Sequence, residues 1–242
     1  MLFKQTYMTI KKHLPNILTL GNLLCGTIAV IFAVQEDFLS AALFVVLGIV
    51  FDFFDGFVAR LLNVSGELGK QLDSLADMVT SGVVPGIVML QLLKNNPVTE
   101  VDSLNYVPYI GLLLTLAACY RLATFNLDTR QTDSFIGLPT PAMSLFVIAL
   151  PLIPIYANNV FFIELAQNNY FLIAVTLVLS YLMNAEISLF SLKFKSFGLK
   201  ENKLKYFFLL ASIALVLCLE VIAIPLVIVL YVLLSVGSNL RK

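Results

Sequence analysis

Charged residues are scarce in this sequence. Asp, Glu, Lys and Arg make up 12% of the 242 residues, whereas 60% of the residues are hydrophobic and the mean hydropathy is +0.94. A soluble domain of this length could not bury so much apolar surface, so the composition excludes a soluble globular protein and indicates a membrane protein. The formal net charge is zero, which gives no electrostatic reason to expect a nucleic acid as partner.

Histidine and cysteine are also rare. The only histidine is His13, and the three cysteines, Cys25, Cys119 and Cys218, lie in apolar runs without the spacing of metal ligands. We interpret the cysteines as small buried hydrophobic residues and His13 as a solvated residue at the membrane interface. No small-residue cleavage site follows the first basic residues, so we expect no cleavable signal peptide.

Long apolar runs predict an all-α, polytopic membrane bundle of about eight transmembrane helices. A helix of about 20 residues crosses the roughly 30 Å hydrocarbon layer. Six spans are expected at residues 16–34, 39–62, 72–93, 106–125, 141–157 and 170–191.

The last apolar stretch, residues 206–236, is too long for one span and has Glu220 and Pro225 near its middle. We expect it to form a hairpin of two short helices, with a single broken or re-entrant helix as the alternative. The chain is therefore divided into a transmembrane core, residues 1–205, and a C-terminal hairpin, residues 206–242.

The distribution of basic residues predicts the orientation of the bundle. With eight spans, all of the 15 Lys and Arg residues except Lys94 fall on one side of the membrane, together with both termini. By the positive-inside rule that side is cytoplasmic. We therefore expect an integral protein of the cell (inner) membrane, with both termini in the cytoplasm.

Four aspartates interrupt the second and third apolar segments: Asp52, Asp55, Asp73 and Asp77. Carboxylates are costly at membrane depth, and four of them close together cannot all stay ionised unless cations lie among them. Carboxylate oxygens suit hard divalent cations, and no His or Cys is near enough in sequence to favour zinc. We expect Mg²⁺ or Mn²⁺ here.

Helical spacing brings these aspartates to one place near the cytoplasmic surface. The first two share a helical stripe with Gly56 and Ala59, and the last two share one with Gly69, while the connector 63–67 reverses the chain between them. A glycine inside a helix costs about 1 kcal/mol relative to alanine, so a ligand or a neighbouring helix is expected to approach the backbone closely. Arg60 could pair with a phosphate or extend to the membrane interface.

The combined pattern, D-x2-D-G-x2-A-R-x8-G-x3-D-x3-D over residues 52–77, resembles the signature of the CDP-alcohol phosphotransferase family. Eight fixed residues at fixed spacing are far rarer by chance than a lone short motif. The runs 15–22, 121–126 and 135–141 look like the phosphatidylserine synthase branch of that family, although Thr124 stands where the branch often has arginine.

This resemblance implies transfer of a phosphatidyl group from CDP-diacylglycerol to L-serine, with release of CMP and the help of two divalent cations. It implies that the metal ligands are Asp52, Asp55, Asp73 and Asp77. Asp77 is also the implied general base for the serine hydroxyl. The residues implied to line the CDP-lipid pocket are Asn16, Thr19, Gly56, Ala59, Arg60 and Gly69.

Serine needs a partner for its carboxylate, and a buried arginine fork suits it. The candidate residues are Arg121 first, then Asn126, Arg130 and Thr140. Arg121 could instead anchor the end of its span, and Asn184 and Glu186 either hydrogen-bond across helices or help to hold the serine ammonium. Since the family is often dimeric, the resemblance also implies a homodimer in the lipid bilayer.

Two other functions compete with this one. A sister enzyme would use glycerol 3-phosphate or an inositol phosphate as acceptor, but these anions call for more basic residues than the connector 126–140 offers, with Asp128 and Asp133 against Arg130. A cation transporter could use the carboxylates as a permeation site, but no second copy of the acidic stretch appears elsewhere in the chain.

Overall fold

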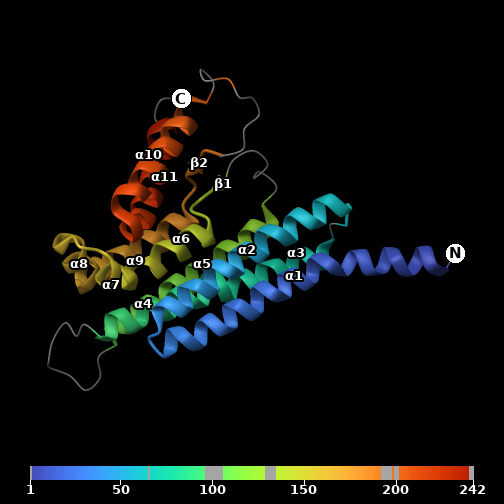
Figure 1. Cartoon of the computed structure of the whole chain (residues 1–242), viewed down its shortest axis with the longest axis horizontal. Coiled ribbons are helices and arrows are strands. Elements are labelled where there is room, and N and C mark those ends of the chain that lie inside the picture. The colour runs from blue at the N-terminus through green and yellow to red at the C-terminus, as the bar shows by residue number, and fades with distance from the viewer. Residues whose placement is uncertain are drawn as a thin grey trace.

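A computed structural model describes residues 2–64, 66–95, 106–128, 135–191, 198 and 202–239, and helices dominate it. The longer helices are α1 (Leu2–Val34), α2 (Phe38–Leu62), α5 (Leu113–Leu127), α9 (Asn169–Asn184), α10 (Lys203–Leu219) and α11 (Ala223–Asn239). The shorter helices are α3 (Glu67–Asp77), α4 (Val84–Asn95), α6 (Thr140–Ala149), α7 (Ile153–Tyr156) and α8 (Val160–Gln167). The prediction of an all-α membrane bundle is confirmed (Figure 1).

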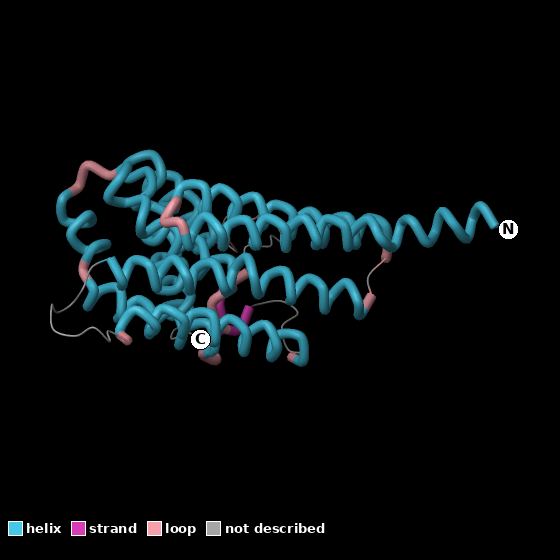
Figure 2. The backbone as a smooth tube through the Cα atoms, turned by 90° about the horizontal axis from the view of Figure 1, so that it is seen from below, coloured by secondary structure: helices cyan, strands magenta, loops and turns pink. Residues whose placement is uncertain are grey.

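Short irregular turns join several of these helices. A π-helical segment, η1 (Met78–Val83), joins α3 to α4, and the 3₁₀ segments are η2 (Val107–Leu112), η3 (Leu150–Leu152) and η4 (Glu220–Ile222). Two short strands, β1 (Phe135–Ile136) and β2 (Ser188–Leu189), pair antiparallel, with Phe135 opposite Leu189. Figure 2 shows this small ladder among the long helices.

The exact count of eight spans is not confirmed. By length and composition, five helical stretches among the described residues could cross a membrane, and a sixth arises if α8 and α9, which meet at a 73° bend, count as one broken span. The fifth predicted span corresponds to Thr140–Tyr156, which is apolar but shorter than a usual span. Cys25 is buried as expected, but Cys119 and Cys218 are exposed, so the expectation of burial was wrong for those two.

The C-terminal apolar stretch folds back on itself at Glu220. This residue has φ 48° and ψ −118°, a conformation that is strained for a residue with a side chain. The rings of Phe208 in α10 and Tyr231 in α11 lie 5.7 Å apart between centroids, so the two helices pack against each other. Tyr231 Oη also donates a hydrogen bond of 2.8 Å to the carbonyl of Phe190. The stretch is thus a hairpin of two 17-residue helices, each about 25 Å long.

Close packing of α1 and α2 against η1 depends on two glycines. A Cβ atom on Gly26 of α1 would lie 2.9 Å from the backbone N and Cα of Thr80. A Cβ atom on Gly48 of α2 would lie 2.8 Å from Asn22 Oδ1. The absence of side chains at these positions lets three helices meet beside the aspartates.

We expect Gly26→Ala to destabilise the protein by about 1–3 kcal/mol, because the new methyl group would press on the Thr80 backbone. The matched control is Gly237→Ala in α11, where a Cβ meets nothing within 4 Å and the better helix propensity of alanine adds up to about 1 kcal/mol. Thermal unfolding in detergent, followed by circular dichroism, measures both. Equal midpoints for the two variants would contradict this account of the packing.

Candidate functional site

Three carboxylates meet where the end of α2 lies against α3. Oxygen atoms of Asp52, Asp55 and Asp73 all lie within 4.8 Å of one another. Asn63, in the left-handed conformation at φ 52° and ψ 46°, closes α2 and lets the chain reverse into α3. Asp55 is 6% exposed, and the other two are half-buried. The predicted convergence of four acids is therefore observed for three of them, and Asp77 is not part of this group.

Helix α1 supplies a hydrogen-bond donor to an acid on each of the two neighbouring helices. Thr19 Oγ1 lies 2.5 Å from Asp55 Oδ2 on α2, and Asn22 Nδ2 donates to Asp77 Oδ1 on α3 at 3.1 Å. Asp77 lies outside the three-carboxylate group, but it is hydrogen-bonded to α1, the helix that also donates to Asp55. These bonds fix the acids in position at membrane depth, where unpaired polar groups are costly.

Thr80 determines which way the Asn22 amide points. Its Oγ1 lies 2.8 Å from Asn22 Oδ1 and 3.2 Å from the Asn22 carbonyl oxygen. Because the amide oxygen accepts from Thr80, the amide nitrogen is left to donate to Asp77. Thr80 belongs to η1, which starts directly after Asp77, and π-helical segments often occur at functional sites.

Sequence reasoning assigned no role to Asn22 or Thr80. Asn22 stands one helical turn after Thr19, and this spacing was an available signal for a shared face. Thr80 could not be found in this way, since its position depends on the π-helical turn, which has no recognised sequence pattern.

The three-carboxylate group fits a divalent cation. Asp73 Oδ1 is buried and makes no hydrogen bond to any residue that the structure describes. An unpaired carboxylate oxygen beside two further carboxylates calls for a positive charge, because the mutual repulsion would otherwise oppose ionisation. A donor set made only of carboxylate oxygens suits Mg²⁺ or Mn²⁺ rather than zinc.

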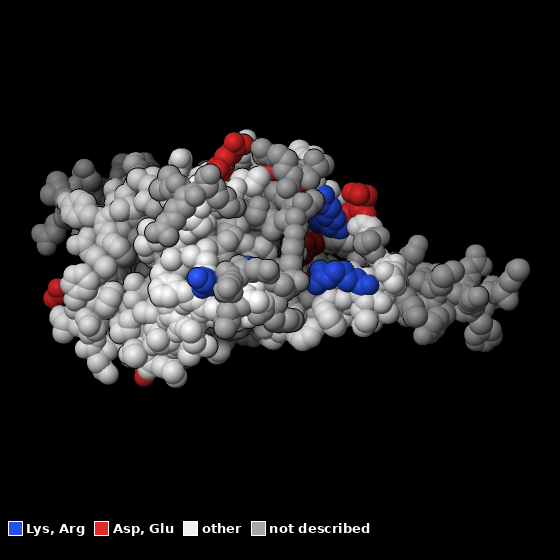
Figure 3. All heavy atoms as spheres, turned by 90° about the horizontal axis from the view of Figure 1, so that it is seen from above, with Lys and Arg blue, Asp and Glu red and all other residues white. Residues whose placement is uncertain are grey.

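The predicted CDP-lipid residues lie around these acids on α1, α2 and α3. A Cβ atom on Gly69 would lie 3.4 Å from Asn16 Oδ1, so α3 faces α1 at this point. The guanidinium of Arg60 folds back over Gly56, with Nη1 3.4 Å from the position of a Cβ there. Ala59, on the next turn of α2, is half-buried. Seen from above, acidic atoms are recessed between basic side chains near the N-terminal helix (Figure 3).

Arg121 lies in a separate polar cavity of about 350 Å³, between the C-terminal ends of α5 and α9. The arginine is 7% exposed, and its guanidinium lies 5.8 Å from the ring centroid of Phe125. Its Nε has no hydrogen-bond partner among the described residues. Asn184 and Glu186 line the same cavity, and the positive charge of Arg121 also acts on Asp77. The cavity therefore carries both signs of charge next to the carboxylate site.

The other predicted serine-binding residues lie elsewhere. Asn126 Nδ2 is 2.8 Å from Ser74 Oγ, and Lys70 Nζ donates to the Asn126 carbonyl at 2.6 Å, so this residue ties α5 to α3. Thr140 is buried at the start of α6 and, like Asn126, does not line the Arg121 cavity. Arg130 lies outside the described residues.

Asn184 also bonds across helices, as one of the two alternatives for it predicted. Its Nδ2 donates to the Ala117 carbonyl of α5 at 3.1 Å and to the Ser180 carbonyl of its own helix at 3.2 Å. Both amide protons are therefore used to join α9 to α5. Glu186, two residues beyond the end of α9, also lines the cavity.

Comparison with known proteins places these residues in a family. The chain is 35% identical over 142 residues to the CDP-diacylglycerol–serine O-phosphatidyltransferase of Bacillus subtilis, covering 57% of this chain and 75% of that protein. It is 30% identical over 174 residues to the Helicobacter pylori protein of the same name, covering 68% and 66%. It is 28% identical over 148 residues to the archaetidylserine synthase of Methanothermobacter thermautotrophicus, covering 60% of each. Residues 12–182 match the family model for CDP-alcohol phosphatidyltransferases, and the chain belongs to that family.

Proposed function

We propose that this protein transfers the phosphatidyl group of CDP-diacylglycerol to L-serine and releases CMP. The observation that carries the proposal is the convergence of Asp52, Asp55 and Asp73, with Asp77 held beside them by Asn22. The family supports the reaction type, and relatives named as serine O-phosphatidyltransferases support serine as the acceptor.

Asp52, Asp55 and Asp73, with a contribution from Asp77, would hold two divalent cations, Mg²⁺ or Mn²⁺. When bound, such cations neutralise the diphosphate oxygens of the donor and the charge on the departing CMP. The buried, unpaired Oδ1 of Asp73 supports this assignment.

Asp77 would act as the general base. Its Oδ1 accepts the hydrogen bond from Asn22, which leaves Oδ2 to take the proton of the serine hydroxyl. As the proton leaves, the serine oxygen forms a bond to the phosphorus on the lipid side, and the bond from that phosphorus to the CMP oxygen breaks. Thr80 maintains this arrangement by orienting the Asn22 amide.

The cavity beside Asp77 suits a small zwitterion. The guanidinium of Arg121 would bind the serine carboxylate, and the carboxylate of Glu186 would attract its ammonium. Asp128 lines the same cavity, so a phosphorylated acceptor such as glycerol 3-phosphate would meet the carboxylates of Asp128 and Glu186 there. The relatives named as serine O-phosphatidyltransferases support serine as the acceptor.

The helices that carry the site set its surroundings. Asn16, Thr19, Gly56, Ala59, Arg60 and Gly69 would line the CDP-lipid pocket. Arg60 at the end of α2 and Lys70 on α3 lie beside the acids, on the side that the positive-inside rule predicts to be cytoplasmic, so we propose that the site opens to the cytoplasm from the inner membrane. A homodimer is part of this proposal on family grounds.

The first test is CMP release by the purified protein from CDP-diacylglycerol with Mg²⁺ or Mn²⁺, comparing L-serine, glycerol 3-phosphate and inositol phosphate. We expect release that depends on serine and stops when EDTA removes the metal. Release with another acceptor alone would move the protein to a sister reaction. Absence of metal-dependent release with every acceptor would favour the cation transporter instead.

Loss of one metal ligand should be visible without turnover. We expect Asp73→Asn to weaken Mn²⁺ binding by at least about tenfold, because it removes an anionic oxygen from the three-carboxylate group. Electron paramagnetic resonance of free Mn²⁺ measures this. The control is Glu67→Gln, an exposed acid in the first turn of the same helix, which should bind Mn²⁺ as the unaltered protein does. A metal affinity unchanged by Asp73→Asn would rule out this ligand.

If Asp77 is the general base, its replacement should slow catalysis without weakening the binding of CDP-diacylglycerol. We expect Asp77→Asn to lower kcat by about 10²–10⁴-fold, because the amide cannot take the serine proton. Binding of CDP-diacylglycerol, measured by equilibrium titration with Mg²⁺, should change little. Turnover at the unaltered rate would show that Asp77 is not the base.

Substitution of Arg121 should act on the acceptor alone. We expect Arg121→Gln to raise KM for serine by about 10–100-fold, since a charge-assisted hydrogen bond to the carboxylate is lost. KM for CDP-diacylglycerol in the same variant is the internal control and should stay within about twofold. Equal changes in both constants would mean that Arg121 supports the fold of the site rather than serine.

A further inference from the structure

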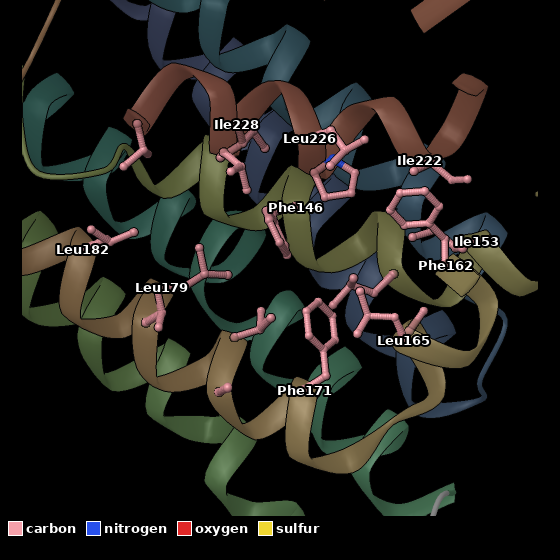
Figure 4. A pocket seen from close by; sticks show the side chains of 18 of the residues that line it. Phe146, Ile153, Phe162, Leu165, Phe171, Leu179, Leu182, Ile222, Leu226 and Ile228 are labelled. Atoms are coloured by element: carbon pink, nitrogen blue, oxygen red, sulfur yellow. The ribbon is translucent and has the colours of Figure 1, made fainter. Parts of the chain in front are cut away.

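A large apolar cavity lies on the other side of the bundle from the aspartates. It measures about 480 Å³ and is bounded by α6, α8, α9 and α11 (Figure 4). Phe146 of α6 and Phe171 of α9 point into the space, and Leu226 faces them from α11. Every described side chain that lines it is apolar. Small-molecule sites in proteins usually offer a few polar groups that orient the ligand, and this cavity offers none.

A second, polar cavity of about 360 Å³ adjoins it at the tip of the hairpin. Ile222 lines both cavities, and Ile153 and Tyr156, which belong to the same short helix α7, line the apolar and the polar cavity respectively. The polar side chains of the second cavity include Asn158, Asn159 and Glu220. None of the described residues that line it is a lysine or an arginine.

The apolar and the polar cavity follow one another along the C-terminal hairpin and meet at Ile222. The apolar cavity follows α11 from Pro225 to Leu233, about 12 Å along the helix axis. The residues that line the polar cavity belong to the end of α7, the connector 157–159, the end of α10 and η4. Figure 1 shows α7 at the opposite end of the bundle from α3. The polar cavity therefore lies at the tip of the hairpin, at one end of the apolar cavity.

The wall formed by α11 is outside the part of the chain that the family model matches, which ends at residue 182. The site is consequently built by the C-terminal hairpin against the catalytic core. None of the aspartates of the candidate site lines either cavity.

We propose that this pair of cavities binds one phospholipid, with an acyl chain in the apolar cavity and an ammonium-bearing head group in the polar one. A hydrocarbon chain is the ligand that needs no polar contact, and the surrounding bilayer supplies it at high concentration. The carboxylate of Glu220 attracts an ammonium, while the lack of a lysine or arginine lining the polar cavity disfavours a purely anionic head group. The lipid joins the hairpin to the core by filling the space between them.

Photolabelling tests the occupant directly, and its readout does not depend on catalysis. The protein in nanodiscs is irradiated with phosphatidylethanolamine that carries a diazirine in mid-chain, and the labelled peptides are mapped. We expect labelling of α9 and α11. Ala174→Trp, at an exposed position that lines the cavity, should reduce the labelling by about tenfold because the indole fills the space.

The matched control is Ala214→Trp, which adds the same indole at an exposed alanine of α10 that does not line the cavity. Labelling should be retained there. Equal labelling of the two variants, or label spread evenly over all exposed helices, would overturn the acyl-chain site. Replacing the probe by diazirine-phosphatidylglycerol should give weaker labelling. Equal labelling by the two lipids, or no effect of Glu220→Gln on their ratio, would overturn the head-group assignment.

A second copy of this chain is the rival occupant. Ala174→Cys, in a protein with Cys119→Ser and Cys218→Ser, should form no disulfide crosslink under mild oxidation and should run at the size of one chain in non-reducing denaturing electrophoresis. A disulfide-linked dimer would show that another protomer covers the cavity, and it would overturn the lipid proposal.

Discussion

The structure depends on keeping carboxylates at membrane depth. Asp52, Asp55 and Asp73 lie within 4.8 Å of one another in a chain whose other helical surfaces are almost wholly apolar. Their mutual repulsion and their desolvation both oppose ionisation, so the neighbouring helices must supply donors and leave room for cations. Helix α1 supplies these donors through Thr19 and Asn22. Glycines at the crossing of α1, α2 and η1 allow the close approach that these hydrogen bonds require. Much of the N-terminal packing is therefore organised by electrostatics.

The general plan of the protein could be predicted from its sequence. Periodicity locates the long helices, and fixed spacing places the aspartates on facing stripes, because helical geometry converts i, i+3, i+4 and i+7 into neighbours. Glu220 and Pro225 indicated the hairpin turn, which the structure places at Glu220. The number of complete spans was harder to predict. Helices α6 and α9 are shorter than expected, and α8 meets α9 at a sharp bend. Hydropathy measures how apolar a segment is, but it does not show where the helix axis bends within that segment.

The second layer of the site shows where sequence reasoning reaches its limit. Thr80 orients Asn22 through a π-helical turn, and that turn arises from packing between segments that are distant in sequence. Likewise, Arg121 and Glu186 line one cavity because α5 and α9 end side by side, a neighbourhood that local patterns do not encode. Asn126, a plausible ligand residue by its motif, is instead bonded to Ser74. Motifs thus identify residue types that chemistry needs, while their partners depend on tertiary structure.

The lengths of the C-terminal helices have a consequence for the membrane itself. Both helices of the hairpin have 17 residues, and the adjacent α9 has 16, so each extends only about 25 Å along its axis. The hydrocarbon layer is about 30 Å thick on average, so this side of the protein has a negative hydrophobic mismatch. Lipids beside the hairpin must shorten or the bilayer must thin locally, whereas α2, with 25 residues, is long enough to cross with some tilt. The flank formed by the hairpin therefore matches a thinner bilayer than the flank formed by α2 does, and we expect thinner membranes to accommodate the hairpin with less elastic cost.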